Sequence, residues 1–189
     1  RDDLVTGVQT CALPISALVR ANGMDEASTD IRFPDEQHDH DHCVAEAIAT
    51  AVEICRERGL RFTRQRRRVL ELVWNSHKPV GAYDILDKLS AEGLGSQPPV
   101  VYRALDFLVR NGFAHRIEGL NAFVACSQPG ESHAPAFLIC RSCEAVSEAA
   151  SDPMRGTLGK AASTAGFVIE NAVVEARGLC PRCAEGAKA

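Results

Sequence analysis

The sequence has no long apolar stretch and no general excess of positive charge. No run approaches the ~18 apolar residues that a membrane-spanning helix needs, so we predict no such segment. The formal net charge is −4, which gives no global signal for nucleic-acid binding. A convincing signal peptide is also missing, so we expect a cytoplasmic protein with reduced cysteines. The 189 residues, 46% hydrophobic and 24% charged, fit one large globular domain or two small ones.

Positive charge is concentrated in a single segment. Residues 56–68 (RERGLRFTRQRRR) contain seven arginines and one glutamate. A local basic patch can bind phosphate groups even on an acidic protein. The arginines are also compatible with an ordinary solvated helix face.

Cysteines give the strongest chemical signal in the sequence. Four of the eight form two C-x-x-C pairs, Cys140 with Cys143 and Cys180 with Cys183, separated by 36 residues. Four thiolates satisfy the tetrahedral preference of zinc, and such a closed set leaves no position open for catalysis. The spacing therefore predicts a structural zinc site. We prefer zinc to a pair of redox disulfides because both cysteine pairs belong to one small predicted domain.

The first 42 residues are expected to contribute little to the fold. Residues 1–16 resemble the in-frame translation of a sequencing adapter, and we exclude them, with Cys11, from functional argument. Residues 17–42 are polar and acidic and predict a flexible tail that ends in the run HDHDH. His-rich tracts can capture metal, and Cys43 could add a ligand. We favour a solvated tail whose metal affinity is adventitious.

Residues 43–125 predict a winged helix-turn-helix domain. Thr63 is a good N-cap, and Gly59 and Gly112 are helix stops. The predicted helices span residues 44–58, 63–75, 81–91 and 98–111, and the predicted hairpin strands span residues 113–118 and 122–126. The positions expected to face the core are Ala47, Ile48, Ala51, Val52, Cys55, Val69, Leu70, Val73, Trp74, Ile85, Leu86, Leu89, Val101, Ala104, Leu105 and Leu108.

The fourth helix carries candidate base-reading residues. Tyr102 and Arg103 fall on its polar side near the N-terminal end. That end of a recognition helix meets base edges in DNA-binding proteins. Arg103 could pair with guanine O6 and N7 or with a phosphate.

Residues 126–189 predict a small α+β domain. The pattern gives strands over residues 136–139 and 145–149, a helix from Asp152 or Pro153 to about Ala165, and a strand over residues 167–176. So few apolar residues make a stable core difficult without a metal or disulfide.

Four further residues are possible metal ligands: His115, Cys126, His133 and Glu148. Each also has an ordinary explanation, as a polar hairpin residue, a packed strand end, a loop residue and a surface carboxylate respectively. Their spacing alone leaves both interpretations open. A zinc hydrolase could use His115, His133 and Glu148, but Cys126 offers a fourth ligand and no separate general base stands out.

Two segments, PPVVYRALDFLVRNGFAHRIEGLNAFVAC and SHAPAFLICRSCEAVSE, resemble the ferric uptake regulator (Fur) family, and most closely its zinc-responsive members. The likeness extends from about Val44 to Cys183 and includes TRQRRRVLE and LCPRC. It implies an α+β fold: an N-terminal winged helix-turn-helix domain, a hinge, and a small C-terminal α/β dimerisation domain stapled by a four-cysteine zinc site.

The resemblance also implies roles for individual residues. Cys140, Cys143, Cys180 and Cys183 match the structural zinc site of the family. A regulatory zinc site is matched by His115, Cys126, His133 and Glu148, which gives about two zinc ions per chain. Tyr83 and Arg103 match DNA-contacting positions. The full set of candidates for DNA contact is Arg64, Arg67, Tyr83, Tyr102 and Arg103.

The function that this resemblance implies is that of a zinc-responsive repressor and not of an enzyme. A homodimer would bind palindromic double-stranded DNA operators of zinc-uptake genes, with no membrane partner. Iron and peroxide regulators of the family carry a His-rich cluster before the first C-x-x-C pair, whereas ESHAPAFLIC here has one His. A thiolate ligand, Cys126, also suits zinc better than iron. Another metal or peroxide sensor of the same fold, and a zinc-buffering protein that uses HDHDH, remain as alternatives.

Overall fold

The computed structural model describes residues 33, 40–76, 78–95, 97–130, 133–151, 156–170 and 172–186. The adapter-like segment and almost all of the predicted tail lie outside these ranges. Of the HDHDH run, only residues 40–42 are described. None of the helices in the described ranges is long and apolar enough to cross a membrane.

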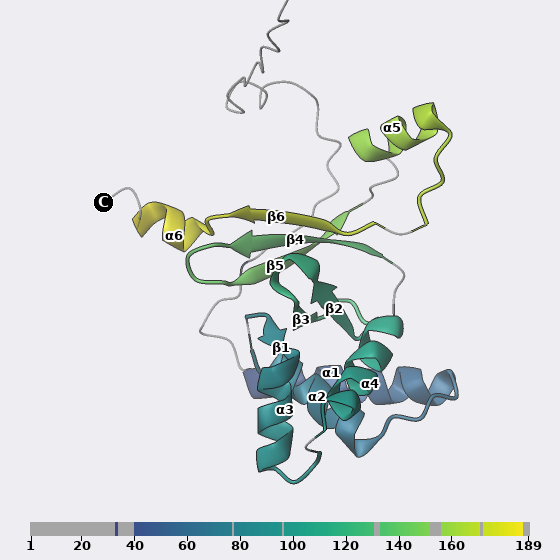
Figure 1. Cartoon of the computed structure of the whole chain (residues 1–189), viewed down its shortest axis with the longest axis vertical. Coiled ribbons are helices and arrows are strands. Elements are labelled where there is room, and N and C mark those ends of the chain that lie inside the picture. The colour runs from purple at the N-terminus through teal and green to yellow at the C-terminus, as the bar shows by residue number, and fades with distance from the viewer. Residues whose placement is uncertain are drawn as a thin grey trace, which may run out of the picture.

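Four helices pack around one core in the first half of the chain (Figure 1). The Thr63 side chain caps the second of them by accepting a hydrogen bond from the Arg66 backbone N–H at 3.3 Å. Leu70, Leu105 and Phe113 are among the largest side chains that are fully buried there. The helices are α1 (His40–Glu57), α2 (Arg64–Trp74), α3 (Ala82–Ala91) and α4 (Pro98–Arg110).

These four helices confirm the predicted elements, with two differences in α1. The helix begins at His40, four residues before the predicted start and inside the segment expected to be a tail. Val52 is 43% exposed and does not face the core, so that prediction is wrong. The buried stripe of α1 runs through Ala47, Ala51 and Cys55, and Val52 lies about 100° beyond it. Trp74 and Leu86 are only partly buried but do pack against the core.

The predicted hairpin is present and forms part of a three-stranded antiparallel sheet, here called the wing sheet. Its order is β1-β3-β2. The β2–β3 turn contains a short 3-10 helix, η2 (Glu118–Leu120), followed by Asn121 with a left-handed φ of 48°. β1 cannot be predicted from sequence, because two residues give no alternating pattern. The strands are β1 (Val80–Gly81), β2 (Ala114–Ile117) and β3 (Ala122–Ala125).

A second three-stranded sheet follows, with the order β5-β4-β6. β5 runs antiparallel to β4, whereas β6 runs parallel to it. α5 connects β5 to β6 and projects away from the sheet (Figure 1). The elements are β4 (Ala134–Cys140), β5 (Val146–Ser151), α5 (Thr157–Ala165), β6 (Val174–Gly178) and α6 (Pro181–Gly186).

The strand predicted over residues 167–176 is wrong in its first part. Phe167 and Val168 are outside any strand and are 68% and 78% exposed. Pairing with β4 begins only at Val174, which lies opposite Ala136. Since a strand needs a partner for its backbone groups, the earlier residues cannot extend it. α5 begins at Thr157, and the predicted helix start at residues 152 and 153 lies outside the described residues.

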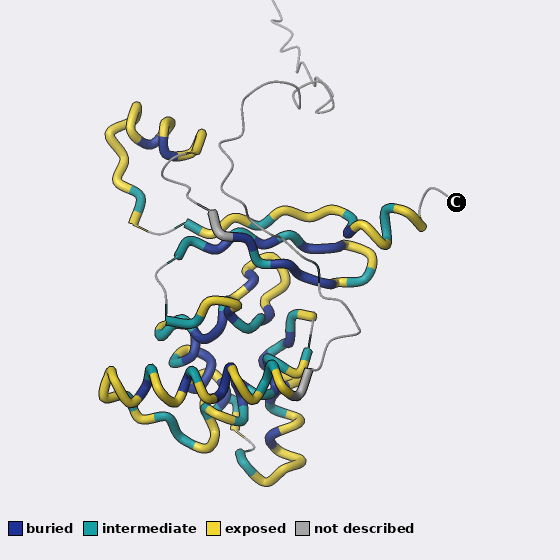
Figure 2. The backbone as a smooth tube through the Cα atoms, turned by 180° about the vertical axis from the view of Figure 1, so that it is seen from behind, coloured by how far each residue is buried: buried dark blue, intermediate teal, exposed yellow. Residues whose placement is uncertain are grey.

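The wing sheet and the second sheet meet at a small apolar cluster. Ile117 at the end of β2 is fully buried against Phe137, Ile139 and Val146 of the second sheet. In Figure 2 the buried part of the second sheet is the side that faces the wing, while α5 is mostly exposed. The second sheet thus completes its core with a residue of the wing, which ties the two sheets together.

Candidate metal centres

The topology of the second sheet brings the two C-x-x-C pairs together. Cys140 ends β4, and Cys180 lies two residues beyond the end of β6. Because these strands are parallel, with Cys140 opposite Gly178, their C-terminal ends lie side by side. Cys143 lies in the turn after β4 and Cys183 lies in α6. The four-cysteine cluster that was predicted therefore forms at one edge of the sheet.

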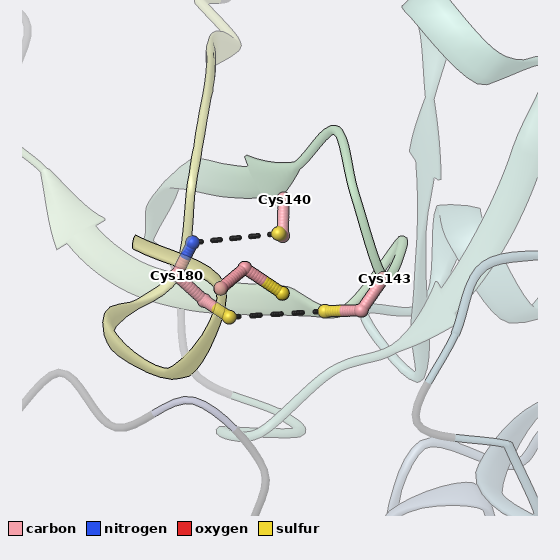
Figure 3. A group of neighbouring side chains, drawn as sticks. Cys140, Cys143 and Cys180 are labelled. Atoms are coloured by element: carbon pink, nitrogen blue, oxygen red, sulfur yellow. Dashed lines mark hydrogen bonds between the residues drawn. The ribbon is translucent and has the colours of Figure 1, made fainter. Parts of the chain in front are cut away.

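The spacing of the thiols matches a zinc tetrahedron. The Sγ atoms of Cys143 and Cys180 are 3.8 Å apart, and all four Sγ atoms lie within 4.8 Å of one another (Figure 3). Four sulfurs bonded to zinc at ~2.3 Å would lie about 3.8 Å apart. The cluster therefore has the donor type, the number of ligands and the spacing of a structural zinc site.

The local charges also favour a cation within the four-cysteine cluster. The Cys143 backbone N–H, then that of Cys180, lower the pKa of the Cys140 thiol to about 6. The Cys183 pKa is instead raised to about 11: the Ser142 hydroxyl lowers it, but the Cys180 and Cys143 thiols outweigh that effect. The backbone thus stabilises the thiolate of Cys140, while the neighbouring sulfurs disfavour ionisation of Cys183. A divalent cation bound among the four sulfurs would favour the thiolate form of all of them.

A second group of ligands lies between the two sheets. His115 is on β2 of the wing sheet, and Cys126 follows directly on β3. His133 immediately precedes β4, and Glu148 is on β5 of the second sheet. One ligand atom from each of the four lies within 4.8 Å of the others. We call these residues the interdomain cluster; the structure thus brings together all four residues that the resemblance had assigned to a regulatory site.

The distances within the interdomain cluster are those of ligands around one ion. The Nε2 atoms of His115 and His133 are 3.2 Å apart, and each lies 2.9 Å from Glu148 Oε1. The Cys126 Sγ lies 3.6 Å from His133 Nε2. Tetrahedral zinc with its usual bond lengths places nitrogen and oxygen ligands about 3.3 Å apart and nitrogen and sulfur about 3.6 Å apart. The cluster therefore fits zinc, with its carboxylate slightly closer than ideal.

Glu148 is held ionised and in a fixed orientation. Its Oε2 accepts hydrogen bonds from the Ser127 backbone N–H at 2.9 Å and from the Ser127 hydroxyl at 2.8 Å. Burial alone would raise the pKa of this carboxyl, but the bonds from His115 and Ser127 lower it to about 2. Oε1 is left directed at the two imidazoles, which is the arrangement that a metal-binding carboxylate needs.

The remaining environment shields the interdomain cluster from water. Cys126 is fully buried, and its Sγ accepts a hydrogen bond from the Gln128 backbone N–H at 3.4 Å. The side chains of His115, His133 and Glu148 are 14%, 12% and 10% exposed. Four protein ligands leave no position for a metal-bound water, so the geometry does not suit a hydrolase.

The residues predicted to contact DNA lie on the helical part of the chain. Tyr83, at the start of α3, is 68% exposed, and Tyr102 on α4 is 42% exposed. Arg103 is exposed beside Tyr102, near the N-terminal end of α4. The structure thus places these side chains on the surface of a helix-turn-helix formed by α3 and α4.

The arginines at the start of α2 differ in their surroundings. Arg64 is exposed, and Arg67 is 56% exposed with its Nε 3.0 Å from Glu71 Oε1. Arg68 is paired with both Glu71 and Glu92, and the Arg66 guanidinium lies 3.6 Å from the centre of the Phe107 ring. Arg66 and Arg68 therefore hold helices together, which leaves Arg64 and Arg67 as the candidates for phosphate contact.

The two clusters are the groups of potential metal ligands found among the described residues. His42 and Cys43 belong to neither of them; His42 is exposed and Cys43 is partly buried. Since the rest of the HDHDH run is not described, its metal binding stays a prediction.

The chain combines a winged helix, an α+β unit and two candidate metal sites. This combination is that of a class of metal-responsive DNA-binding regulators. The sequence pattern of the ferric uptake regulator family matches residues 57–177, and the chain belongs to this family. The chain is 40% identical over 143 residues to the zinc uptake regulation protein of Escherichia coli, covering 74% of this chain and 82% of that protein. It is 27% identical over 128 residues to the protein of the same name from Mycobacterium tuberculosis, covering 66% and 95%.

Solved structures give the same result. A zinc uptake regulator complexed with zinc and DNA matches with a TM-score of 0.71 and 38% identity, over 77% of this chain and 98% of that one. The crystal structure of holo XcZur matches with a TM-score of 0.68 and 40% identity, over 74% and 98% respectively. Members of this family are transcription regulators, so the chain is not an enzyme.

The structure shows three further residues with contacts near the wing that the sequence did not predict. Ser127 orients Glu148, and Glu175 and Arg177 of β6 contact the β2–β3 turn. Ser127 could have been suspected because it follows a ligand directly. Glu175 and Arg177 carry no such signal, since their partners are backbone groups 56 to 58 residues away.

Proposed function

We propose that this chain is a zinc-responsive transcriptional repressor that binds operator DNA as a homodimer. The observation that supports the proposal most is the position of the interdomain cluster, with one ligand on β2 of the wing and the others on the hinge and the second sheet. Zinc held by all four ligands would fix the wing sheet against the second sheet. The division into a DNA-binding domain over residues 43–125 and a dimerisation domain over residues 126–189 belongs to the same proposal.

Metal binding by these residues would set the orientation of the winged helix relative to the second sheet. Without the ion, the two imidazoles and the carboxylate of the interdomain cluster are a polar group buried between sheets, and the winged helix is held less firmly. With all four ligands engaged, the helix-turn-helix of each subunit takes a defined position. Two recognition helices at a fixed separation match the half-sites of a palindrome. A coupling of ~1–3 kcal/mol is enough for such a response.

The proposed DNA surface uses exposed side chains on α2, α3 and α4. Arg103 would read a base or grip a phosphate from the N-terminal part of α4, beside Tyr102 and Tyr83. Arg64 and Arg67 would contact phosphates, with Arg67 partly neutralised by Glu71 until DNA approaches. A DNA partner also makes the cytoplasm the expected compartment.

Arg103→Ala should weaken operator binding about 5- to 150-fold, the equivalent of the ~1–3 kcal/mol that a base-contacting arginine contributes. Zinc content should not change, because Arg103 is exposed near the N-terminal end of α4 and belongs to neither cluster. Affinity is measured by fluorescence anisotropy with a duplex selected from a random library in the presence of zinc. Arg110→Ala, an exposed arginine at the opposite end of α4, is the matched control and should bind almost normally. Equal losses in both variants would contradict the assignment of Arg103.

The partner for dimerisation would be a second copy of this chain, docked on α5 and the segment that follows it. Leu158 is 52% exposed on α5, and Phe167 and Val168 are 68% and 78% exposed. Val174, which begins β6, is 40% exposed, and Val173 just before it is 45% exposed. Exposed apolar side chains that recur between residues 158 and 174 favour a protein interface.

Phe167→Asp should therefore shift the protein from dimer to monomer, because it places a charge within the apolar contact. Sedimentation velocity at micromolar concentration measures the change. The control is Lys160→Asp, an exposed position on α5 about 200° around the helix from Leu158. Each subunit should keep its zinc. A variant that stays fully dimeric would place the interface elsewhere.

Metal selectivity separates this proposal from a sensor of another metal. Zinc should raise DNA affinity at lower free concentration than iron(II), manganese or nickel, because the interdomain cluster combines one thiolate with two imidazoles. A zinc-buffering protein predicts a different result: removal of residues 1–42 would abolish most metal binding. We expect the shortened chain to keep two zinc ions and its DNA response.

A further inference from the structure

Two side chains of β6 grip the β2–β3 turn of the wing. Glu175 Oε1 accepts a hydrogen bond from the Glu118 backbone N–H at 2.6 Å, and Oε2 accepts one from the Gly119 N–H at 3.0 Å. The Arg177 guanidinium donates to the Gly119 carbonyl at 2.5 Å. We call Glu175 and Arg177 the β6 clasp. The clasp binds two backbone N–H groups and one backbone carbonyl of the same short turn.

The β6 clasp acts from the face of the second sheet that meets the wing. Side chains two residues apart on a strand point to the same face, so Glu175 and Arg177 emerge together. In register on β4, Glu175 is opposite Phe137 and Arg177 is opposite Ile139. Phe137 and Ile139 are the residues that bury Ile117 of β2. Polar and apolar contacts to the wing therefore come from one face.

The contacts also satisfy groups that the turn itself leaves unpaired. Glu118 and Gly119 open the 3-10 helix η2, and the first N–H groups of a helix have no partner within it. A carboxylate that accepts two of them forms charge-assisted hydrogen bonds, which are stronger than neutral ones. Arg177 adds a charged donor on the carbonyl of Gly119, so the grip does not depend on a single bond.

Strand β2 is consequently fixed to the second sheet at three successive places. His115 belongs to the interdomain cluster, Ile117 is buried in the apolar cluster, and Glu118 and Gly119 are held by the clasp. These places fall within five consecutive residues, 115–119, at the end of β2 and the start of η2. A shift of the turn would move His115, because only residues 116 and 117 separate His115 from Glu118.

We propose that Glu175 and Arg177 are positioning residues that hold the wing in the orientation in which His115 can join Cys126, His133 and Glu148. The inference rests on the proposed function for its link to DNA, but the clasp itself is a separate structural claim. Both the clasp and the interdomain cluster stabilise the same docked arrangement. By linkage, loss of the clasp weakens zinc binding at the interdomain cluster, and zinc tightens the clasp.

Glu175→Gln tests the clasp without reference to DNA. The amide keeps the shape of the side chain but removes the charge and turns an N–H toward a backbone N–H. Amide hydrogen exchange at Glu118 and Gly119 should become about tenfold faster, since charge-assisted hydrogen bonds are lost from a partly exposed site. Zinc affinity of the interdomain cluster should fall about five- to tenfold, while saturating zinc still gives two ions per chain.

Gly119→Ala offers an independent test from the other side of the contact. A Cβ at position 119 would lie 2.7 Å from Glu175 Oε2 and 2.8 Å from Arg177 Nη2. Both atoms are ends of flexible side chains, so the protein can fold while the clasp is pushed away. Gly186→Ala is the matched control, because a Cβ there meets nothing within 4 Å. Gly119→Ala should reproduce the effects of Glu175→Gln, and Gly186→Ala should leave exchange and zinc affinity unchanged.

Two results would overturn the inference. Unchanged exchange at Glu118 and Gly119 in Glu175→Gln would mean that the clasp does not form. Faster exchange with unaltered zinc affinity in both variants would mean that it does not position His115. Neither readout uses DNA, so a wild-type protein that failed to bind DNA in response to zinc would contradict the proposed function and leave the clasp to be judged by these two measurements.

Discussion

Cys126→Ser should yield a folded dimer that holds one zinc ion per chain instead of two and no longer binds its operator more tightly when zinc is added. Serine is similar in size and can still accept the hydrogen bond that Gln128 N–H gives to Cys126 Sγ. It cannot supply a thiolate, and the interdomain cluster would be left with two imidazoles and a carboxylate. The expected loss of zinc-dependent DNA affinity is about 5- to 150-fold.

Zinc per chain is measured by mass spectrometry of the metal, and DNA binding by anisotropy with and without zinc. Cys43→Ser is the matched control, because Cys43 belongs to neither cluster. We expect it to behave as the unaltered protein. If Cys126→Ser kept its full response to zinc, the interdomain cluster would not be the regulatory site.

Cys140→Ser should have a different and larger effect, because it removes a ligand of the structural cluster. The second sheet has a small core of its own: Phe137, Ile139 and Val146 are buried together with Ile117 from the wing. Structural zinc contributes an apparent ~10–16 kcal/mol in small zinc-binding units, which is as large as the whole stability of many domains. We expect the second sheet to unfold and the dimer to dissociate.

Circular dichroism melting and size-exclusion chromatography measure these losses. The helical part should keep a separate transition, because its core of Leu70, Leu105 and Phe113 comes from α2, from α4 and from the turn between α4 and β2. Chelation of zinc from the unaltered protein under reducing conditions should give the same result as Cys140→Ser. A variant that retained two zinc ions and the original melting temperature would contradict a structural role for the four-cysteine cluster.

The sequence predicts the helices well because each has one clear apolar stripe and is bounded by a cap, a glycine or a proline. Thr63 marks the start of α2, and the fully buried Val101, Leu105 and Leu108 mark one side of α4. The four-cysteine cluster follows from spacing, because two C-x-x-C pairs around one sheet have little freedom. Val52 was placed wrongly because it borders the buried stripe of α1, where a pattern cannot give the exact edge.

What the sequence does not predict depends on contacts between distant segments. β1 and the true start of β6 are set by their partner strands, not by local pattern. Spacing could not decide whether His115 and His133 meet; the docking of the wing on the second sheet brings their Nε2 atoms within 3.2 Å. The clasp depends on backbone atoms of a turn, which have no residue-specific signature.

The most direct test of the central claim is a zinc titration in which zinc bound per chain and DNA affinity are followed together. The four-cysteine cluster should fill first and give the folded dimer, without yet giving it full DNA affinity. The second equivalent should enter the interdomain cluster and raise DNA affinity in parallel with its occupancy. Full DNA affinity after the first equivalent, or DNA affinity that ignored the second, would contradict control of the wing by the interdomain cluster.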